Sequence, residues 1–144
     1  MVTKMSNEKE VYVNISGKVY KMTSDDDYLE SVKLDYEPDM VRLYRVLANE
    51  SKVIIDVGAN VGCTALLFAE LSESVHAFEP SPSTFNFLKN NVSSSGLRNV
   101  ILYNLGLGDE TGNFTLTYSP SNRSGGFVSN HTHASVGHTE ETII

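Results

Sequence analysis

The N-terminal part of the chain alternates apolar and polar residues with the period of a β-strand. Val11, Val13 and Ile15 fall on one face of an extended segment, and Gly17 follows in a position suited to a tight turn. Residues 11–22 therefore predict a β-hairpin with one buried face.

Helical spacing replaces this alternation after residue 36. Apolar side chains recur with the i, i+3, i+4, i+7 spacing of a helix at Met40, Leu43, Tyr44 and Leu47. Pro38 stands between two acids and suits the first turn of a helix, so we expect a helix that packs on a sheet through this stripe. Between hairpin and helix, Asp25-Asp26-Asp27 is interpreted as a solvated turn in preference to a metal site.

The middle of the chain alternates short apolar runs with segments of helical spacing. Strands are expected near 53–57, 74–79, 100–105 and 114–118, and helices near 62–71 and 83–95. Ser83 is the expected N-cap of the later helix, whose apolar face includes Leu88 and Val92. An alternation of buried strands and helices is typical of a parallel α/β sheet. From Ser119 onward polar residues dominate, and we expect irregular chain.

Composition narrows the class of protein. A chain of 144 residues is one domain with room for a real core, and its net charge of −7 argues against a nucleic acid as the main partner. The single cysteine, Cys63, excludes an internal disulfide framework. The sequence shows neither a signal peptide nor an apolar run long enough to span a bilayer, so we expect no membrane partner and a cytoplasmic location.

The strongest chemical signal follows the apolar run 53–55, in the segment Asp56-Val57-Gly58-Ala59-Asn60-Val61-Gly62-Cys63. Glu79 closes the next apolar run. A strand, a glycine-bearing turn, a helix and a second strand with a terminal acid form the first half of a nucleotide-binding α/β unit. The glycines allow a tight turn with backbone N–H groups close to a ligand, and Glu79 suits a ribose diol because a carboxylate accepts two hydroxyl hydrogen bonds. The alternative is a strand-turn-helix unit that binds no ligand.

The spacing of the glycines separates two cofactor classes. A dinucleotide site is typical of G-x-G-x-x-G, whereas here Ala59 and Asn60 stand among three residues between the two glycines. Asp56, two residues before the first glycine, would repel a pyrophosphate but attract the ammonium of an amino-acid group. We therefore expect S-adenosylmethionine (SAM) as the cofactor in preference to NAD.

Several segments together resemble the FkbM family of SAM-dependent methyltransferases: Asp56 to Gly62, Ala77-Phe78-Glu79-Pro80, Asn90-Asn91, and Leu105-Gly106-Leu107-Gly108-Asp109 with Gly112. The resemblance runs from about Tyr36 to about Gly126. It implies an α/β fold with a Rossmann-like class I methyltransferase sheet. It also implies O-methylation of a small-molecule acceptor, a hydroxyl group of a sugar or a polyketide-like natural product.

Family members that resemble this chain carry a larger sheet than the first three core strands, N-terminal hairpin and β-hairpin extension expected here. We therefore expect a fragment, with a hairpin and acidic loop at 1–35, a truncated SAM-binding core at 36–118 and an irregular polar tail at 119–144. The acceptor half of the site would lie beyond the third strand. The chain alone is expected not to catalyse methyl transfer. No residue is assigned as the catalytic base.

The predicted cofactor-binding residues are Asp56, Gly58, Ala59, Asn60, Gly62, Glu79, Pro80 and Asp109. Asp56 is expected at the methionine end of SAM, or alternatively as a cap of the following helix. Glu79 is expected at the ribose, and Pro80 shapes the adenine side. Asp109 follows the third strand, where this fold commonly meets the adenine amino group, although a turn aspartate is the alternative.

Three neighbouring residues have open alternatives. Asn60 either donates to a ligand carboxylate or tolerates a strained turn conformation, and Thr64 either donates to the same carboxylate or packs in the core. Tyr36 is a weaker candidate to reach over the methionine group. No metal is expected: the histidines near the C-terminus are interpreted as part of a polar tail, not as zinc ligands.

Two functions from other classes stay open. A non-catalytic SAM-binding or interaction module would show the same cofactor motif, and measured turnover separates it from an enzyme. An NAD-dependent oxidoreductase is disfavoured by the missing third glycine and by Asp56.

Overall fold

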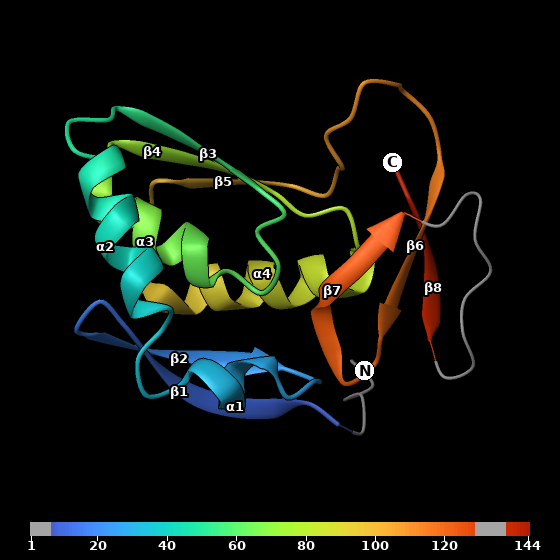
Figure 1. Cartoon of the computed structure of the whole chain (residues 1–144), viewed down its shortest axis with the longest axis horizontal. Coiled ribbons are helices and arrows are strands. Elements are labelled where there is room, and N and C mark those ends of the chain that lie inside the picture. The colour runs from blue at the N-terminus through green and yellow to red at the C-terminus, as the bar shows by residue number, and fades with distance from the viewer. Residues whose placement is uncertain (1–6, 129–137) are drawn as a thin grey trace.

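The computed structural model describes residues 7–128 and 138–144, which fold into strands and helices around one small parallel sheet (Figure 1). The parallel sheet has the strand order β3-β4-β5, formed by Val53–Val57, Ser74–Phe78 and Val100–Tyr103. The helices are α1 (Tyr28–Val32), α2 (Pro38–Leu47), α3 (Cys63–Leu71) and α4 (Pro82–Ser95). An antiparallel pair joins β1 (Lys9–Ile15) to β2 (Lys18–Ser24). A second antiparallel sheet, in the order β7-β6-β8, consists of Asn122–Val128, Phe114–Ser119 and Thr139–Ile143.

The parallel sheet forms where the short apolar runs predicted it. Val75 and Ala77 of β4, the middle strand, are fully buried, because helices α3 and α4 connect the strands and lie against the sheet. The α/β class with an incomplete parallel sheet is therefore confirmed for the described residues.

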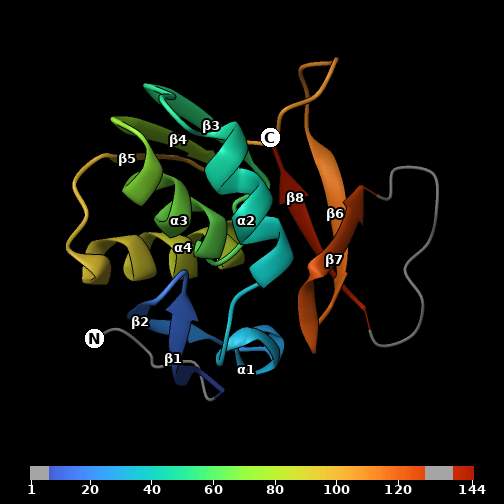
Figure 2. The ribbon, with the colours of Figure 1, turned by 60° about the vertical axis from the view of Figure 1, so that its left-hand side comes forward.

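The predicted N-terminal hairpin is confirmed, and it lies on the side of the helices opposite the parallel sheet (Figures 1 and 2). Asn91 of α4, only 2% exposed, connects it to the rest of the core. Its side-chain oxygen accepts from the N–H of Thr23 at 2.7 Å, and its amide donates to the carbonyl oxygen of Val61 at 2.8 Å. Hairpin, α4 and the turn after β3 therefore form one unit.

The other face of the parallel sheet carries apolar side chains that the described residues leave uncovered. Val53, Ile55 and Val57 of β3 are 56%, 61% and 62% exposed, and Ile101 of β5 is 47% exposed. Alternation along a strand sends these side chains to the face away from α3 and α4. Parallel sheets are usually covered on both faces, so this face is unusual for its class.

The apolar stripe predicted for α2 is mostly wrong. Leu43 and Leu47 are 47% and 67% exposed, whereas Val41 is buried. Tyr44 is the one stripe residue with a clear apolar contact, an edge-to-face contact with Phe68 of α3 at 5.1 Å between ring centroids. The buried side of α2 is therefore rotated from the predicted stripe toward Val41, and Tyr44 belongs to both.

The N-cap predicted for α4 is also displaced. Ser81, not Ser83, caps the helix: its hydroxyl accepts from the N–H of Thr84 at 3.1 Å, and Pro82 takes the first helical position. Gly96 ends the helix with a positive φ of 79°, as the sequence predicted.

The prediction of irregular chain from Ser119 is wrong where the structure describes it. β7 and β8 pair with β6 on its two sides, so the expected hairpin extension is a three-stranded sheet. Ladder hydrogen bonds come from the backbone and need no apolar side chain, which is why two edge strands of largely polar sequence can form. Residues 129–137, with His131 and His133, lie outside the described residues.

Candidate cofactor site

The turn after β3 is held against the end of β4 by its own backbone. The N–H groups of Gly58 and Ala59 both donate to the carbonyl oxygen of Phe78, each at 2.9 Å. The N–H of Asn60 donates to Oε2 of Glu79, also at 2.9 Å. The expectation that these N–H groups point at a ligand is therefore wrong, because the protein itself uses them. Asn60 has a positive φ of 50°, so it occupies the strained turn position that asparagine tolerates.

Glu79 is a buried carboxylate with partners on both oxygens. Besides the bond from Asn60, Oε1 accepts from the N–H of Ser81 at 2.9 Å, and the residue is only 6% exposed. Burial raises the pKa of Glu79, and the two backbone donors oppose that shift. Glu79 was expected at the ribose, and the structure adds that the protein itself already holds this carboxylate. Each oxygen still keeps one lone pair for a further donor.

Asp56, the next-to-last residue of β3, is a buried acid that is only 6% exposed. The hydroxyl of Thr64 donates to its Oδ2 at 2.7 Å, and burial raises the pKa of Asp56 against this bond. Asp56 does not cap α3, since the N-cap residue is Gly62 and no side chain caps this helix. Gly62 has a φ of 110°, and a Cβ atom there would lie 3.0 Å from a side-chain carbon of Leu88. Gly62, predicted as a cofactor-binding residue, lines neither cavity described below and is instead required for close contact with Leu88 of α4.

Two small adjoining cavities flank this turn. The first, of about 160 Å³, is lined by Tyr28, Tyr36, Gly58, Ala59, Asn60, Cys63, Thr64 and Ser124. The second, of about 150 Å³, is lined by Gly58, Asn60, Glu79, Pro80, Ser81, Thr84, Leu116, Tyr118, Arg123, Ser124 and Gly126. The structure therefore brings together five of the predicted residues at one site: Gly58, Ala59, Asn60, Glu79 and Pro80. Asp56 reaches the first cavity through the hydroxyl of Thr64.

Arg123 fixes β7 beside this turn. Its guanidinium makes a forked contact with Asp25, with both N···O distances 2.6 Å, and its backbone N–H donates to Oδ2 of Asp26 at 2.8 Å. The guanidinium also lies over the ring of Tyr118, 4.8 Å from its centroid. The interpretation of Asp25-Asp26-Asp27 as a solvated turn is thus wrong for two of the three residues, because they hold Arg123 and are largely buried. Through this clamp Ser124 of β7 reaches both cavities.

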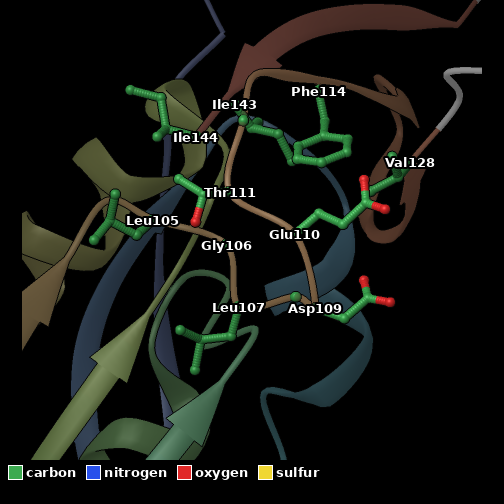
Figure 3. Close-up of a pocket in the computed structure, with 12 residues that line it drawn as sticks. Leu105, Gly106, Leu107, Asp109, Glu110, Thr111, Phe114, Val128, Ile143 and Ile144 are labelled. Atoms are coloured by element: carbon green, nitrogen blue, oxygen red, sulfur yellow. The ribbon is translucent and has the colours of Figure 1, made fainter.

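Asp109 is placed apart from the other predicted site residues. It is exposed and lines a third cavity of about 490 Å³, bounded by the loop 105–112, Phe114 and the last two residues of the chain. Figure 3 shows Asp109 and Glu110 on this loop with both carboxylates on the side away from Leu105. The structure does not bring Asp109 to either cavity beside the glycine turn.

Tyr28, Arg123 and Ser124 line the site but were missed in the sequence. Arg123 and Ser124 lie in the segment interpreted as irregular, and their site contacts depend on pairing between β6 and β7. Tyr28 follows the acidic triplet and carries no motif. One signal was present: an aspartate triplet and a lone arginine in polar surroundings are the residue types of a buried ion pair.

Residues 7–128 and 138–144 contain neither a metal-binding cluster nor a membrane-spanning helix. No group of three or more His, Cys, Asp or Glu side chains there is arranged to hold a metal ion. No helix in this described part is both long enough and apolar enough to cross a membrane.

The chain is similar in sequence to two curated methyltransferases. Over 84 residues it is 37% identical to the hexuronic acid methyltransferase AglP of Haloferax volcanii, a match that covers 58% of this chain and 34% of the relative. Over 73 residues it is 30% identical to Methyltransferase 1 of Beauveria bassiana, covering 49% of this chain and 29% of the relative. The chain thus spans about a third of the length of the curated relatives it matches. No protein-family model matches it.

Among solved structures, the chain is similar to Trm5b from Pyrococcus abyssi, with a TM-score of 0.50 and 24% identity. That match covers 69% of this chain and 28% of the other. At this identity the likeness speaks for the fold alone. The described residues have a Rossmann-like class I methyltransferase fold with a partial sheet.

Proposed function

We propose that this chain binds SAM as part of an enzyme that transfers the methyl group to a hydroxyl group of a sugar or polyketide-like natural product. The observation that carries the proposal is the arrangement of two buried carboxylates around the glycine turn. Asp56 and Glu79 end adjacent parallel strands, each is 6% exposed, and each keeps room for a ligand donor. Ligands of open α/β sheets bind at this carboxyl edge.

The way the turn is bonded favours SAM over a dinucleotide. A dinucleotide site needs backbone N–H groups directed at the pyrophosphate. Here the N–H groups of Gly58, Ala59 and Asn60 are all occupied by the end of β4. Asp56 and Glu79 would add two negative charges beside a pyrophosphate, whereas SAM offers an ammonium and a ribose diol to them.

Each of the two carboxylates has a proposed partner in the cofactor. Asp56, oriented by Thr64, accepts from the ammonium of the methionine group. Glu79, oriented by the N–H groups of Asn60 and Ser81, accepts from the ribose hydroxyls with its remaining lone pairs. Pro80 borders the base. A bound SAM supplies an electrophilic methyl group, and the protein's task is to align an acceptor oxygen and take its proton.

The size of the site sets a condition on binding. Each cavity is smaller than the roughly 300 Å³ at which small-molecule pockets begin, and both are bordered by Gly58, Asn60 and Ser124. A ligand that reaches from Thr64 to Glu79 occupies both cavities at once. We therefore expect Ser124 of β7 to move when SAM binds.

The proposed acceptor has its own support. A sugar hydroxyl is supported by the similarity to a relative named for hexuronic acid and by the likeness of the glycine turn to the FkbM family. The net charge of −7 speaks against nucleic acid as the substrate. The cytoplasmic location belongs to the same proposal, and cell fractionation tests it.

Calorimetry tests the cofactor. Folded protein titrated with SAM should release or absorb heat, and the same protein titrated with NAD should not. NAD binding without SAM binding would overturn the proposal in favour of an oxidoreductase.

Methyl transfer tests the reaction. Labelled SAM is incubated with a panel of sugars, sugar acids and hydroxylated natural products, with RNA as a further acceptor. Transfer to a hydroxyl of a small molecule supports the proposal, and transfer to RNA contradicts it. SAM binding by the longest gene product without transfer to any acceptor would favour a non-catalytic module.

A further inference from the structure

Two tyrosines line the cavity of about 160 Å³ together with Thr64, whose hydroxyl donates to Asp56. Tyr28 begins α1 and Tyr36 lies just before α2, so both rings come from the segment that joins the hairpin to α2. Tyr36 is 5% exposed, and Tyr28 is half-buried. The hairpin segment therefore supplies one wall of a cavity whose other wall is the glycine turn.

Their hydroxyl groups have few partners inside the protein. Burial raises the pKa of both tyrosines, so both are protonated donors at physiological pH. Among the residues that the structure describes, neither hydroxyl has a hydrogen-bond partner apart from the other one. A hydrogen bond between the two hydroxyls uses one of their two protons and leaves the other for a group in the cavity. Tyr28 is the more exposed of the two residues, so its hydroxyl is the better placed to donate that proton.

An anionic ligand group fits this wall. Burial keeps Tyr28 protonated, so its hydroxyl stays a donor. No lysine or arginine lines the cavity among the described residues, so its side-chain donors are neutral, chiefly the hydroxyls of the two tyrosines and Ser124 and the amide of Asn60. The carboxylate of Asp56 is the nearby group for a cation. An α-amino acid carries an ammonium and a carboxylate on one carbon, and it needs one acceptor wall and one donor wall close together.

We infer that the hydroxyls of Tyr28 and Tyr36 bind the carboxylate of the methionine group of SAM, across the cavity from Asp56. This inference rests on the proposed function and adds residues that no glycine-turn motif includes. Both tyrosines are binding residues in this assignment and take no part in methyl transfer.

The test compares two ligands that differ only in the carboxylate, SAM and decarboxylated SAM. The affinity of each is measured by calorimetry for the wild type, Tyr28→Phe and Tyr36→Phe. Tyr12→Phe is the matched control, because Tyr12 is 60% exposed on the hairpin. The wild type should bind SAM more tightly than decarboxylated SAM, by roughly 10- to 100-fold, the scale of hydrogen bonds to a charged group. Tyr28→Phe should remove most of this preference while leaving the affinity for decarboxylated SAM within about twofold of the wild type.

The outcomes separate this inference from the proposed function. If the wild type binds neither ligand, the proposed function fails. If the wild type prefers SAM and both phenylalanine variants keep the full preference, the tyrosine assignment is wrong and the proposed function stands. If Tyr12→Phe keeps the wild-type preference for SAM, the loss of preference in the other variants is not a general effect of removing a tyrosine hydroxyl.

A measurement on the wild type covers the case in which a variant does not fold. The chain has seven tyrosines, and each can be labelled with ¹³C at the ring carbon that bears the oxygen. The NMR signals of two of them should shift when SAM binds and should not shift when decarboxylated SAM binds. Equal shifts with both ligands would overturn the assignment.

Discussion

Replacement of Glu79 by alanine perturbs ligand binding and the glycine turn at the same time. In the folded protein Oε1 and Oε2 each accept one backbone N–H, from Ser81 and Asn60. One lone pair on each oxygen is left for the ribose diol. Glu79→Ala therefore removes the proposed ribose contact and leaves two N–H groups in a largely buried place without their acceptor.

The two losses have different magnitudes. A hydrogen bond to a charged group contributes about 1.5–3 kcal/mol, which corresponds to a 10- to 150-fold weaker dissociation constant for SAM. For folding, an unpaired buried donor costs about 1–3 kcal/mol. The cavity of about 150 Å³ beside Glu79 admits water, so we expect the loss in unfolding free energy to stay near the lower end, about 1–2 kcal/mol.

Calorimetry with SAM and urea unfolding on the same preparation separate the two effects. Glu73→Ala is the matched control, because it removes one exposed acid from the turn before β4 and should change neither quantity. A Glu79→Ala protein that binds SAM as tightly as the wild type would remove Glu79 from the site. If the Glu79→Ala protein has the same free energy of unfolding as the wild type, Glu79 does not hold the glycine turn.

The pH dependence of stability gives a second readout for Glu79. Burial raises the pKa of Glu79 above its usual 4.5, so the folded state holds this proton more tightly than the unfolded chain. The resulting stability is present below pH 4.5 and is lost as the pH rises through the raised pKa. The side chain of the Glu79→Gln variant does not ionise, so this variant does not lose that contribution to stability. Between pH 4.5 and 7 its free energy of unfolding should therefore fall less than that of the wild type. Parallel curves for the two proteins would contradict the shift.

Three further predictions concern other parts of the site. Gly62→Ala should lower the free energy of unfolding by roughly 2–4 kcal/mol, because alanine is strained in the left-handed conformation and overpacks the site. Gly125→Ala is the control: its Cβ would meet nothing within 4 Å, so its free energy of unfolding in urea should be nearly that of the wild type. Arg123→Met should cost about 3 kcal/mol of stability; a double-mutant cycle with Asp25→Asn should show coupling, and purely additive losses would refute the clamp. Asp109→Ala should leave SAM affinity unchanged, and a tenfold loss would return Asp109 to the cofactor site.

Local signals were enough to predict the order of the elements around the glycine turn. The positions of β3, α3 and β4 follow from short apolar runs separated by glycines, which depend only on neighbours in the chain. Failures came where a partner distant in sequence decides the structure. In α2, Val41 is buried and Leu47 is 67% exposed, and no spacing rule within α2 contains that information.

The candidate site shows the same division. The sequence by itself determined that Asp56 and Glu79 end adjacent strands beside a glycine turn, because strand ends and turns are local features. Only the tertiary structure decided which groups around them are free: the turn N–H groups are occupied by Phe78 and Glu79, contacts that exist only once two parallel strands align. Tyr28 and Arg123 reach the site for the same reason. Their contacts span up to 98 residues of chain, and such distant pairings are fixed by the folded core, which no local pattern encodes.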